Sequence, residues 1–417
     1  MQSNHIYPPV NSLSPSLVDT PLPSLGEGLG LKSAWRKSFE QKPSHQLHRL
    51  LLPLLLGGFL LLSCSPSEAQ KKKARPPVIS SWDVEAKEYY GTPQSEAAVT
   101  KGLAWLASRQ GADGHWASGG YRNEIAITGL CILSYLASGH QPGRGRFGLL
   151  LNEAVDFLVE SVRMDGYYGA PGLVRAIGQG GPAMYGHGFG TLALAEVYGM
   201  TRRKDVKRKL EAAIRLIEST QTQNGDPRTD GGWRYEPRQG DADISVTVVQ
   251  VLALRGAKNA GIKVSQEVID RAVNYIKRCG NPRDGGFSYQ VTSRQSGPAR
   301  SGGGVLSLLM AGERDSVECR NGLAYLTANP LNRLNEWSYR EHYYYALYYI
   351  TQAMYQAGGE HWKSWYIPLR DRLVAAQDPE GSWSRRDNSS EAGPEYATAM
   401  AILVLQVPAG LLPIYQK

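Results

Sequence analysis

Cysteine is scarce in this chain of 417 residues, which contains only four. Apart from Cys64, the remaining three are widely spaced, at Cys131, Cys279 and Cys319, and this odd set does not make a disulfide framework. The zinc-binding spacings Cys-x2-Cys and His-x3-His are also missing from the sequence. The sequence therefore predicts no zinc site and no other cofactor.

Excess positive charge is lacking in the part of the chain where a nucleic-acid binder would need it. The formal net charge is +8, but residues 1–63 hold +2 and residues 64–79 hold +3, which leaves +3 for residues 80–417. A nearly neutral domain is poorly suited to neutralise a row of phosphates. The sequence therefore predicts no nucleic-acid partner.

The apolar run near the N-terminus is too short for a comfortable membrane span. Residues 50–62 follow Arg49 and have the length of a secretory signal core. The run ends in LLSC, with Cys64 directly after Ser63, and this ending resembles the lipobox of bacterial lipoproteins. A lipid on the Cys64 thiol would anchor the mature chain to a membrane.

The alternative is ordinary signal cleavage after SEA, where Ser67 and Ala69 are the small residues. Under either interpretation we expect an exported protein, either a membrane-anchored lipoprotein or a periplasmic one. We predict a disordered leader and signal peptide over residues 1–64 and a flexible tether over residues 65–82.

From about residue 83 onward, two kinds of helical segment alternate. One kind is amphipathic, as in VKRKLEAAIRLIES, whose apolar stripe is formed by Val206, Leu210, Ala213, Ile214 and Ile217. The other kind is apolar nearly all round, as in DISVTVVQVLAL and EYATAMAILVLQV, which is typical of helices buried on every side.

Each amphipathic segment is joined to the next apolar one by a Gly-rich turn that carries an aromatic residue. Six such turns occur, at Trp116, Tyr167, Trp233, Phe287, Trp337 and Trp383. Six hairpins with amphipathic helices outside and apolar helices inside predict an all-α, (α/α)6 toroid over residues 83–417. A closed ring leaves no repeat with an unpaired apolar face.

Two of these turns share the spacing Gln-x3-Gly-x-Trp. We expect the Gln to hydrogen-bond open backbone groups at a helix end, the Gly to turn the chain with positive φ, and the Trp to cover the joint. The pattern occurs at Gln110, Gly114 and Trp116, and again at Gln377, Gly381 and Trp383.

The stretch KGLAWLASRQGADGHW, residues 101–116, resembles the QW motif of squalene and oxidosqualene cyclases. The DGGW and DGGF turns resemble those of protein prenyltransferase β subunits. Residues 90–417 as a whole look like the prenyltransferase/squalene oxidase repeat proteins. The resemblance implies the toroid fold, whereas one fold hosts many activities.

Squalene–hopene cyclases carry a DxDDT-type motif whose middle acid protonates an alkene. The similar stretch here is GDADIS, so the resemblance implies Asp243 as the catalytic acid, assisted by Asp241. Ile244 and Ser245 depart from that motif, and the residues themselves favour Asp243 as the N-cap of the following helix. The zinc-binding Asp-x-Cys pair of the prenyltransferases does not occur.

Inner helices that start after the turns are expected to converge on one mouth of the ring. This places substrate-binding candidates around Asp243, namely Tyr185, His187, Tyr343 and Glu395. A single ring of this size implies a smaller substrate than squalene, a partner protein, or lost catalysis.

Three functions remain open at this stage. The first is a terpene cyclase-like or prenyltransferase-like toroid that acts on an isoprenoid, with Asp243 as the acid. The second is a non-catalytic envelope lipoprotein that binds an apolar ligand or a protein. The third is a sugar-cleaving toroid with a pair of carboxylates in a cleft. The sequence leaves open whether the protein is an enzyme.

Overall fold

The computed structural model describes residues 89–118, 124–168, 183–329, 343–384 and 392–416. All of them belong to the compact unit Arg75–Lys417, whereas the unit Met1–Ala74 lies outside the described ranges. The predicted leader with Cys64, the tether and Trp337 also fall outside these ranges.

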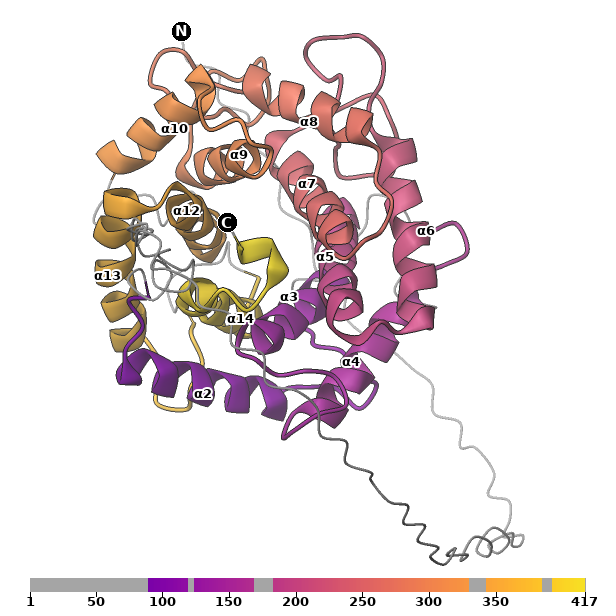
Figure 1. Ribbon diagram of the computed structural model, residues 1–417, viewed down its shortest axis with the longest axis vertical. Helices are drawn as coiled ribbons and strands as arrows, with labels where there is room; N and C mark the ends of the chain where they lie inside the picture. The colour runs from indigo at the N-terminus through magenta and orange to yellow at the C-terminus, as the bar shows by residue number, and fades with distance from the viewer. Residues whose placement is uncertain (1–88, 119–123, 169–182, 330–342, 385–391, 417) are drawn as a thin grey trace, which may run out of the picture. The chain divides into compact units, whose positions relative to one another are not determined.

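Twelve α-helices lie in the described ranges, which contain no β-strand. They alternate along the chain between an outer and an inner position (Figure 1). The outer helices are α2 (Pro93–Ser108), α4 (Gly148–Ser161), α6 (Lys204–Thr220), α8 (Gln266–Arg278), α10 (Val317–Ala328) and α13 (Gly359–Ala375). The inner helices are α3 (Glu124–Ala137), α5 (Ala183–Thr201), α7 (Ile244–Asn259), α9 (Pro298–Met310), α12 (Tyr343–Ala357) and α14 (Pro394–Gln406).

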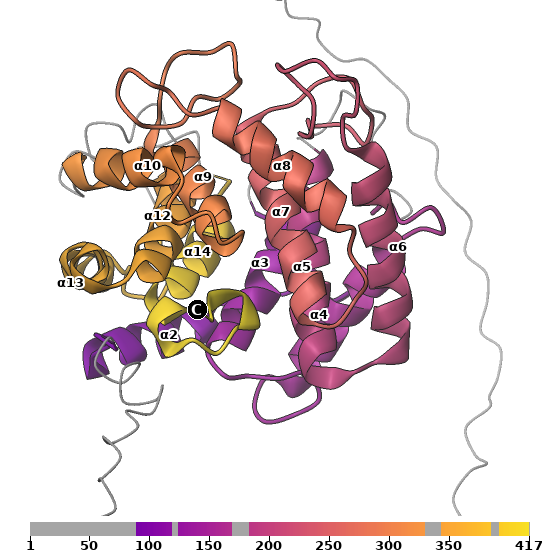
Figure 2. The ribbon, with the colours of Figure 1, turned by 45° about the horizontal axis from the view of Figure 1, so that its top comes forward.

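The inner helices form a closed circle within this unit. Going around it, α3 contacts α5, and the contacts continue through α7, α9, α12 and α14 back to α3. The outer helices surround this circle, and both Figure 1 and Figure 2 place α6 outside α5 and α13 outside α12. The predicted all-α toroid of six helical hairpins is therefore confirmed.

Residue polarity explains why a helix lies outside or inside. The five residues of the predicted stripe on α6 are all buried, and charged side chains occupy its other face. On α7, by contrast, every residue from Val246 to Leu254 is buried. The Val and Thr residues of α7 would suit a strand, but neighbours on all sides make a helix the better way to bury them.

None of the helices in the described ranges is both long and apolar enough to cross a bilayer.

Three hairpin corners repeat one set of hydrogen bonds. At each corner a Gln side-chain amide donates to the carbonyl of the turn Gly and to a carbonyl of the next outer helix. The Trp indole N–H donates, at 2.8 Å, to a carbonyl of the preceding outer helix. The corners are those of Gln110 and Trp116, Gln221 and Trp233, and Gln377 and Trp383. The Trp covers the joint as predicted. The Gln does bond backbone carbonyl groups, but these belong to the turn glycine and to the next outer helix and not to open groups at a helix end. Gln221 adds a third corner, which its wider spacing concealed in the sequence.

The turn glycines bring each corner into backbone contact with the next outer helix. All five corner glycines in the described ranges have positive φ, and a Cβ on any of them would overlap a main-chain carbonyl of that helix. The pairs are Gly114 with Glu153, Gly166 with Ala212, Gly231 with Arg271, Gly285 with Asn321, and Gly381 with Lys101. The predicted positive φ of Gly114 and Gly381 is confirmed.

The last described corner closes the ring. Gln377, which follows α13, donates from Nε2 to the carbonyl oxygen of Ala98 in α2 at 2.8 Å and to that of Gly381 at 2.9 Å. Helix α2 also packs against α13 and α14. The first and last hairpins therefore meet through the same contacts that join neighbouring hairpins elsewhere.

Replacing Gln377 by alanine should lower the free energy of unfolding by about 1–3 kcal/mol, because the two hydrogen bonds that join the corner to α2 and to Gly381 are lost. Urea unfolding of both proteins measures this difference. Gln239→Ala is the matched control, since the exposed Gln239 makes a single hydrogen bond, to the Ser219 carbonyl oxygen. We expect the control to stay within about 0.5 kcal/mol of the parent protein. Equal effects of the two substitutions would contradict the closing role of Gln377.

Candidate functional site

Several inner helices begin close together at one end of the ring, which we call the N-terminal rim. The Tyr345 hydroxyl at the start of α12 donates to the Ser245 carbonyl oxygen at the start of α7, at 3.3 Å. The ring of Tyr345 also lies 6.2 Å from that of Tyr185 at the start of α5. The predicted convergence is therefore confirmed for these three helices.

Asp243 is fixed in place by its own backbone and by a helix end. Its amide donates to the Trp233 carbonyl oxygen at 2.9 Å, and the next amide, of Ile244, donates to the Tyr289 carbonyl oxygen at 3.0 Å. One carboxylate oxygen of Asp243 accepts from the Val246 amide at 2.9 Å, with extended backbone dihedrals at Asp243. The predicted N-cap of α7 is confirmed.

The second carboxylate oxygen of Asp243 faces Arg234, a residue that the sequence analysis did not single out. Arg234 Nε lies 3.3 Å from Asp243 Oδ2, and Arg234 Nη1 lies 3.1 Å from Asp241 Oδ2. The guanidinium carbon also stands 4.7 Å from the ring centre of Tyr235 and 5.5 Å from that of Tyr289. We call these five residues the Arg234 cluster.

Burial controls the ionisation of Asp243. Its side chain has no exposed surface, and this burial raises the pKa of the carboxyl to about 6, although the Val246 amide and Arg234 both favour the ionised form. Near neutral pH the carboxylate is therefore mostly ionised and paired with a guanidinium. This arrangement is unfavourable for protonating an alkene, because such a weak base needs a strong, protonated acid.

Aromatic surface lies beside the Arg234 cluster. The ring of Tyr185 lies 6.3 Å from that of Tyr235, and the ring of Tyr345 lies 4.6 Å from that of Tyr349. We call Tyr185, Tyr345 and Tyr349 the tyrosine wall. Tyr185 and Tyr345 are half-buried, and burial raises the pKa of both hydroxyls well above the usual value for tyrosine. They therefore stay neutral while presenting aromatic surface at the N-terminal rim.

The structure places His187 apart from this cluster. Its side chain is fully buried, and Nε2 lies 3.1 Å from the Ala213 carbonyl oxygen in α6. Its ring also packs against those of Tyr167 and Tyr168. Burial lowers the pKa of His187 to about 4, so the imidazole is neutral and joins α5 to the outer helix α6.

Tyr343 and Glu395 also occupy separate positions. Tyr343 is buried, and its ring lies edge-on to that of Tyr344 at 5.2 Å. Glu395, at the start of α14, accepts from Arg109 Nε at 3.0 Å and from the Ser118 hydroxyl at 2.9 Å. These contacts fasten α14 to the end of α2. Of the six candidates at the predicted mouth, the structure thus gathers Asp241, Asp243 and Tyr185.

The described ranges contain no cluster of potential metal ligands. Within the described ranges, no three His, Cys, Asp or Glu side chains lie close enough together to hold a metal ion. Cys131, Cys279 and Cys319 are each buried, and none of these three forms a disulfide.

No known family model matches the sequence, and no curated protein matches it either. Solved structures do match. A type II terpene cyclase from Scytonema is 13% identical, with 77% of this chain and 100% of that chain covered and a TM-score of 0.50. Cellobiose 2-epimerase from Bacillus thermoamylovorans is 12% identical, with 73% and 95% covered and a TM-score of 0.53.

An α-mannanase from Bacteroides thetaiotaomicron is likewise 12% identical, with 77% of this chain and 97% of that chain covered and a TM-score of 0.54. At these identities the matches establish the fold that the chain shares with terpene cyclases and with sugar enzymes. They do not choose between those chemistries, so the function has to be argued from the site.

Proposed function

We propose that the N-terminal rim binds an apolar, isoprenoid-like molecule without transforming it, with the partly exposed Tyr185 and Tyr345 of the tyrosine wall as the contact surface. Tyr185 and Tyr345 are both partly exposed, and their ring centres lie 6.2 Å apart. Flat aromatic faces pack well against an unsaturated hydrocarbon chain. A site that is mostly apolar with a few fixed polar groups is typical of small-molecule binding.

The observation that carries this proposal is that Asp243 serves as a helix cap and as one half of an ion pair. One oxygen accepts from the Val246 amide, and the other lies 3.3 Å from Arg234 Nε, which is an ion-pair distance without hydrogen-bond geometry. An acid held in this way stabilises the rim but has no free proton for an alkene. Binding therefore explains the arrangement more simply than catalysis does.

Proton transfer by Asp243 is the second candidate. It is favoured by the pKa of about 6, which leaves part of the population protonated in mildly acid solution, and by the aromatic side chains close by. Aromatic faces would stabilise a carbocation. The terpene cyclase from Scytonema shares the fold, which makes this chemistry worth testing.

One experiment separates the two candidates. The purified full-length chain is incubated with geranylgeraniol or squalene and freed of unbound lipid, and the bound material is then extracted and analysed by mass spectrometry. Recovery of unchanged isoprenoid supports binding. A cyclised product that Asp243→Asn abolishes would establish the second candidate instead, and no retained isoprenoid would contradict both.

Tyr345→Ala should reduce retention of geranylgeraniol about tenfold, since one aromatic face contributes about 1–1.5 kcal/mol. Tyr325→Ala provides the matched control, because Tyr325 is also half-buried but lies on the outer helix α10. We expect the control to retain as much ligand as the parent protein. Equal losses in the two variants would show that the tyrosine wall is not the contact surface.

A further inference from the structure

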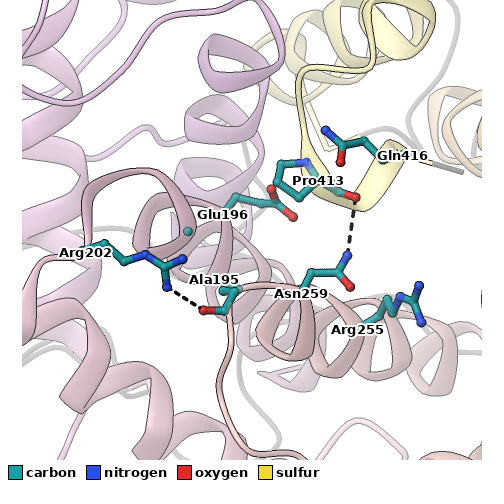
Figure 3. A pocket seen from close by; sticks show the side chains of 10 residues that line it. Ala195, Glu196, Arg202, Arg255, Asn259, Pro413 and Gln416 are labelled. Atoms are coloured by element: carbon teal, nitrogen blue, oxygen red, sulfur yellow. Dashed lines mark hydrogen bonds between the residues drawn. The ribbon is translucent and has the colours of Figure 1, made fainter. Parts of the chain in front are cut away.

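A pocket of about 480 Å³ opens at the other end of the inner ring, which we call the C-terminal rim. It lies between the last turns of α5 and α7 and the C-terminal 3-10 turn η2 (Pro413–Tyr415) (Figure 3). Glu196 in this pocket is eleven residues beyond Tyr185, which is about 16 Å along a helix. The pocket is therefore separate from the tyrosine wall.

A buried carboxyl group with few polar neighbours faces this pocket. Glu196 is 2% exposed, and within the described ranges neither carboxyl oxygen has a hydrogen bond of good geometry, although the backbone amide of Ile414 is near enough to favour the ionised form. Burial also raises the pKa of Glu196 to about 8. A buried carboxyl that lacks partners is costly, so such a group calls for an explanation.

Two arginines line the same pocket, and Figure 3 shows Glu196 between their side chains. Arg202 has a φ of 56°, and in the described ranges it is the one residue other than glycine with positive φ. Its Nη1 donates to the Ala260 carbonyl oxygen at 2.9 Å, and its guanidinium carbon lies 5.2 Å from the Tyr198 ring centre. The guanidinium is thus held in place at the pocket in spite of an unfavourable backbone conformation.

Arg255 differs from Arg202 because it is exposed and forms no hydrogen bond or ion pair in the described part of the chain. The wall opposite is closed by η2, where the Pro413 carbonyl oxygen accepts from Asn259 Nδ2 at 3.4 Å. None of the described residues that line the pocket is aromatic. The pocket is therefore poorly suited to stack on a sugar or to pack against a hydrocarbon chain.

We propose that the pocket binds a small zwitterion, with a primary ammonium group on Glu196 and a carboxylate or phosphate group on Arg255. An ammonium group supplies the donors and the charge that the Glu196 carboxyl lacks. Guanidinium groups are well suited to bind a planar carboxylate or a phosphate. The volume is that of a small-molecule site.

Calorimetry with the full-length chain at pH 7 tests the proposal with three zwitterions: glycylglycine, triglycine and phosphoethanolamine. The first two offer a carboxylate and the third a phosphate, so their order of affinity identifies the anionic group. N-acetylglycine, which lacks the ammonium group, and ethanolamine, which lacks the anion, should bind at least tenfold more weakly than the best zwitterion.

Binding of the ammonium group should also ionise Glu196. The heat of binding should therefore differ between buffers of low and high ionisation enthalpy by the amount that one released proton requires. Absence of proton release together with equal affinity for N-acetylglycine would overturn the assignment of Glu196. Absence of binding by all three zwitterions at about 10 mM, a concentration that still detects millimolar affinity, would overturn the proposal as a whole.

Two variants complete the test. Glu196→Gln keeps the size of the side chain and should abolish both the proton release and the preference for a free ammonium group. Arg255→Gln should weaken the best zwitterion at least tenfold. Arg215→Gln is the control, since Arg215 is also exposed but lies on the outer helix α6. Equal weakening by Arg255→Gln and Arg215→Gln would contradict a specific anion site.

Discussion

Replacing Gly231 by alanine is expected to lower the free energy of unfolding by about 2–5 kcal/mol. Gly231 has a φ of +89°, and a Cβ at this position would overlap the carbonyl oxygen of Arg271 in α8. Alanine would therefore carry two separate costs. The first is the strain of a left-handed backbone, and the second is the displacement of a hairpin corner from the helix on which it rests.

Gly261→Ala carries only the first cost, so the difference between the two variants gives the second. Gly261 has nearly the same φ, +86°, but no atom lies within 4 Å of the place that its Cβ would occupy. We expect this variant to lose about 1–2 kcal/mol, from backbone strain alone. Urea unfolding monitored by helical circular dichroism measures both proteins. Equal losses would mean that the corner relaxes without cost and that close backbone contact does not hold the outer helices together.

Glu196→Gln is expected to stabilise the protein by about 4 kcal/mol at pH 8, and to have little effect near pH 4.5. The Glu196 carboxyl has an ordinary pKa of 4.5, and in the folded protein the pKa rises to about 8. Between these two pH values the folded state holds a proton that the unfolded state has released. The free energy of unfolding therefore falls as the pH rises through this interval. Glutamine does not ionise, so the variant does not lose stability in this way.

The measurement is a series of urea unfolding curves from pH 4.5 to pH 8 for the parent protein and the variant, without amino acids or amines in the buffer. Asp243 also has a raised pKa, but it is present in both proteins, so its contribution cancels in the difference. Glu160→Gln is the control, because Glu160 is exposed on α4. A difference between parent and Glu196→Gln that does not change with pH would contradict the proposed ionisation.

The fold could be predicted because amphipathic and wholly apolar helices alternate along the chain. A ring with the amphipathic helices outside and the apolar helices inside buries the apolar surface of both kinds. The charged face of α6 requires solvent, and the uncharged surface of α7 requires neighbours on all sides. The third corner was harder to predict, because nine residues lie between Gln221 and Gly231, whereas three lie between the Gln and the Gly of the other two Gln-containing corners. The hydrogen bonds are the same at all three corners. The longer loop after Gln221 therefore preserves these contacts although it breaks the sequence pattern.

The site was predicted less well, because its geometry depends on residues distant in sequence. The N-cap of Asp243 is a local property and could be foreseen. Its pairing with Arg234 depends on how the turn at Trp233 folds back onto the start of α7. His187 lies on the same helix as Tyr185, but a shift of two positions rotates it toward the outer helix α6.

Glu196 did carry a signal that the sequence analysis passed over. It stands in the stretch LALAEVYGM, and it is the one carboxylate in a helix that contains no Asp, Lys or Arg. A glutamate is rarely buried unless it is paired with another group, so its position in this helix indicates a specific role. Arg202 gave no comparable signal, because its positive φ is a feature of the three-dimensional backbone alone.

The hydrogen bond from Gln377 to Ala98 also limits how such a protein can change in length. An open stack of helical hairpins accepts one more unit at either end, because each unit touches only its neighbours. In a circle whose two ends are joined, an additional hairpin would alter the angle at every corner and pull each glycine away from its helix. The number of units is therefore fixed by curvature, and new features can be added more readily in the loops than by duplication of a hairpin.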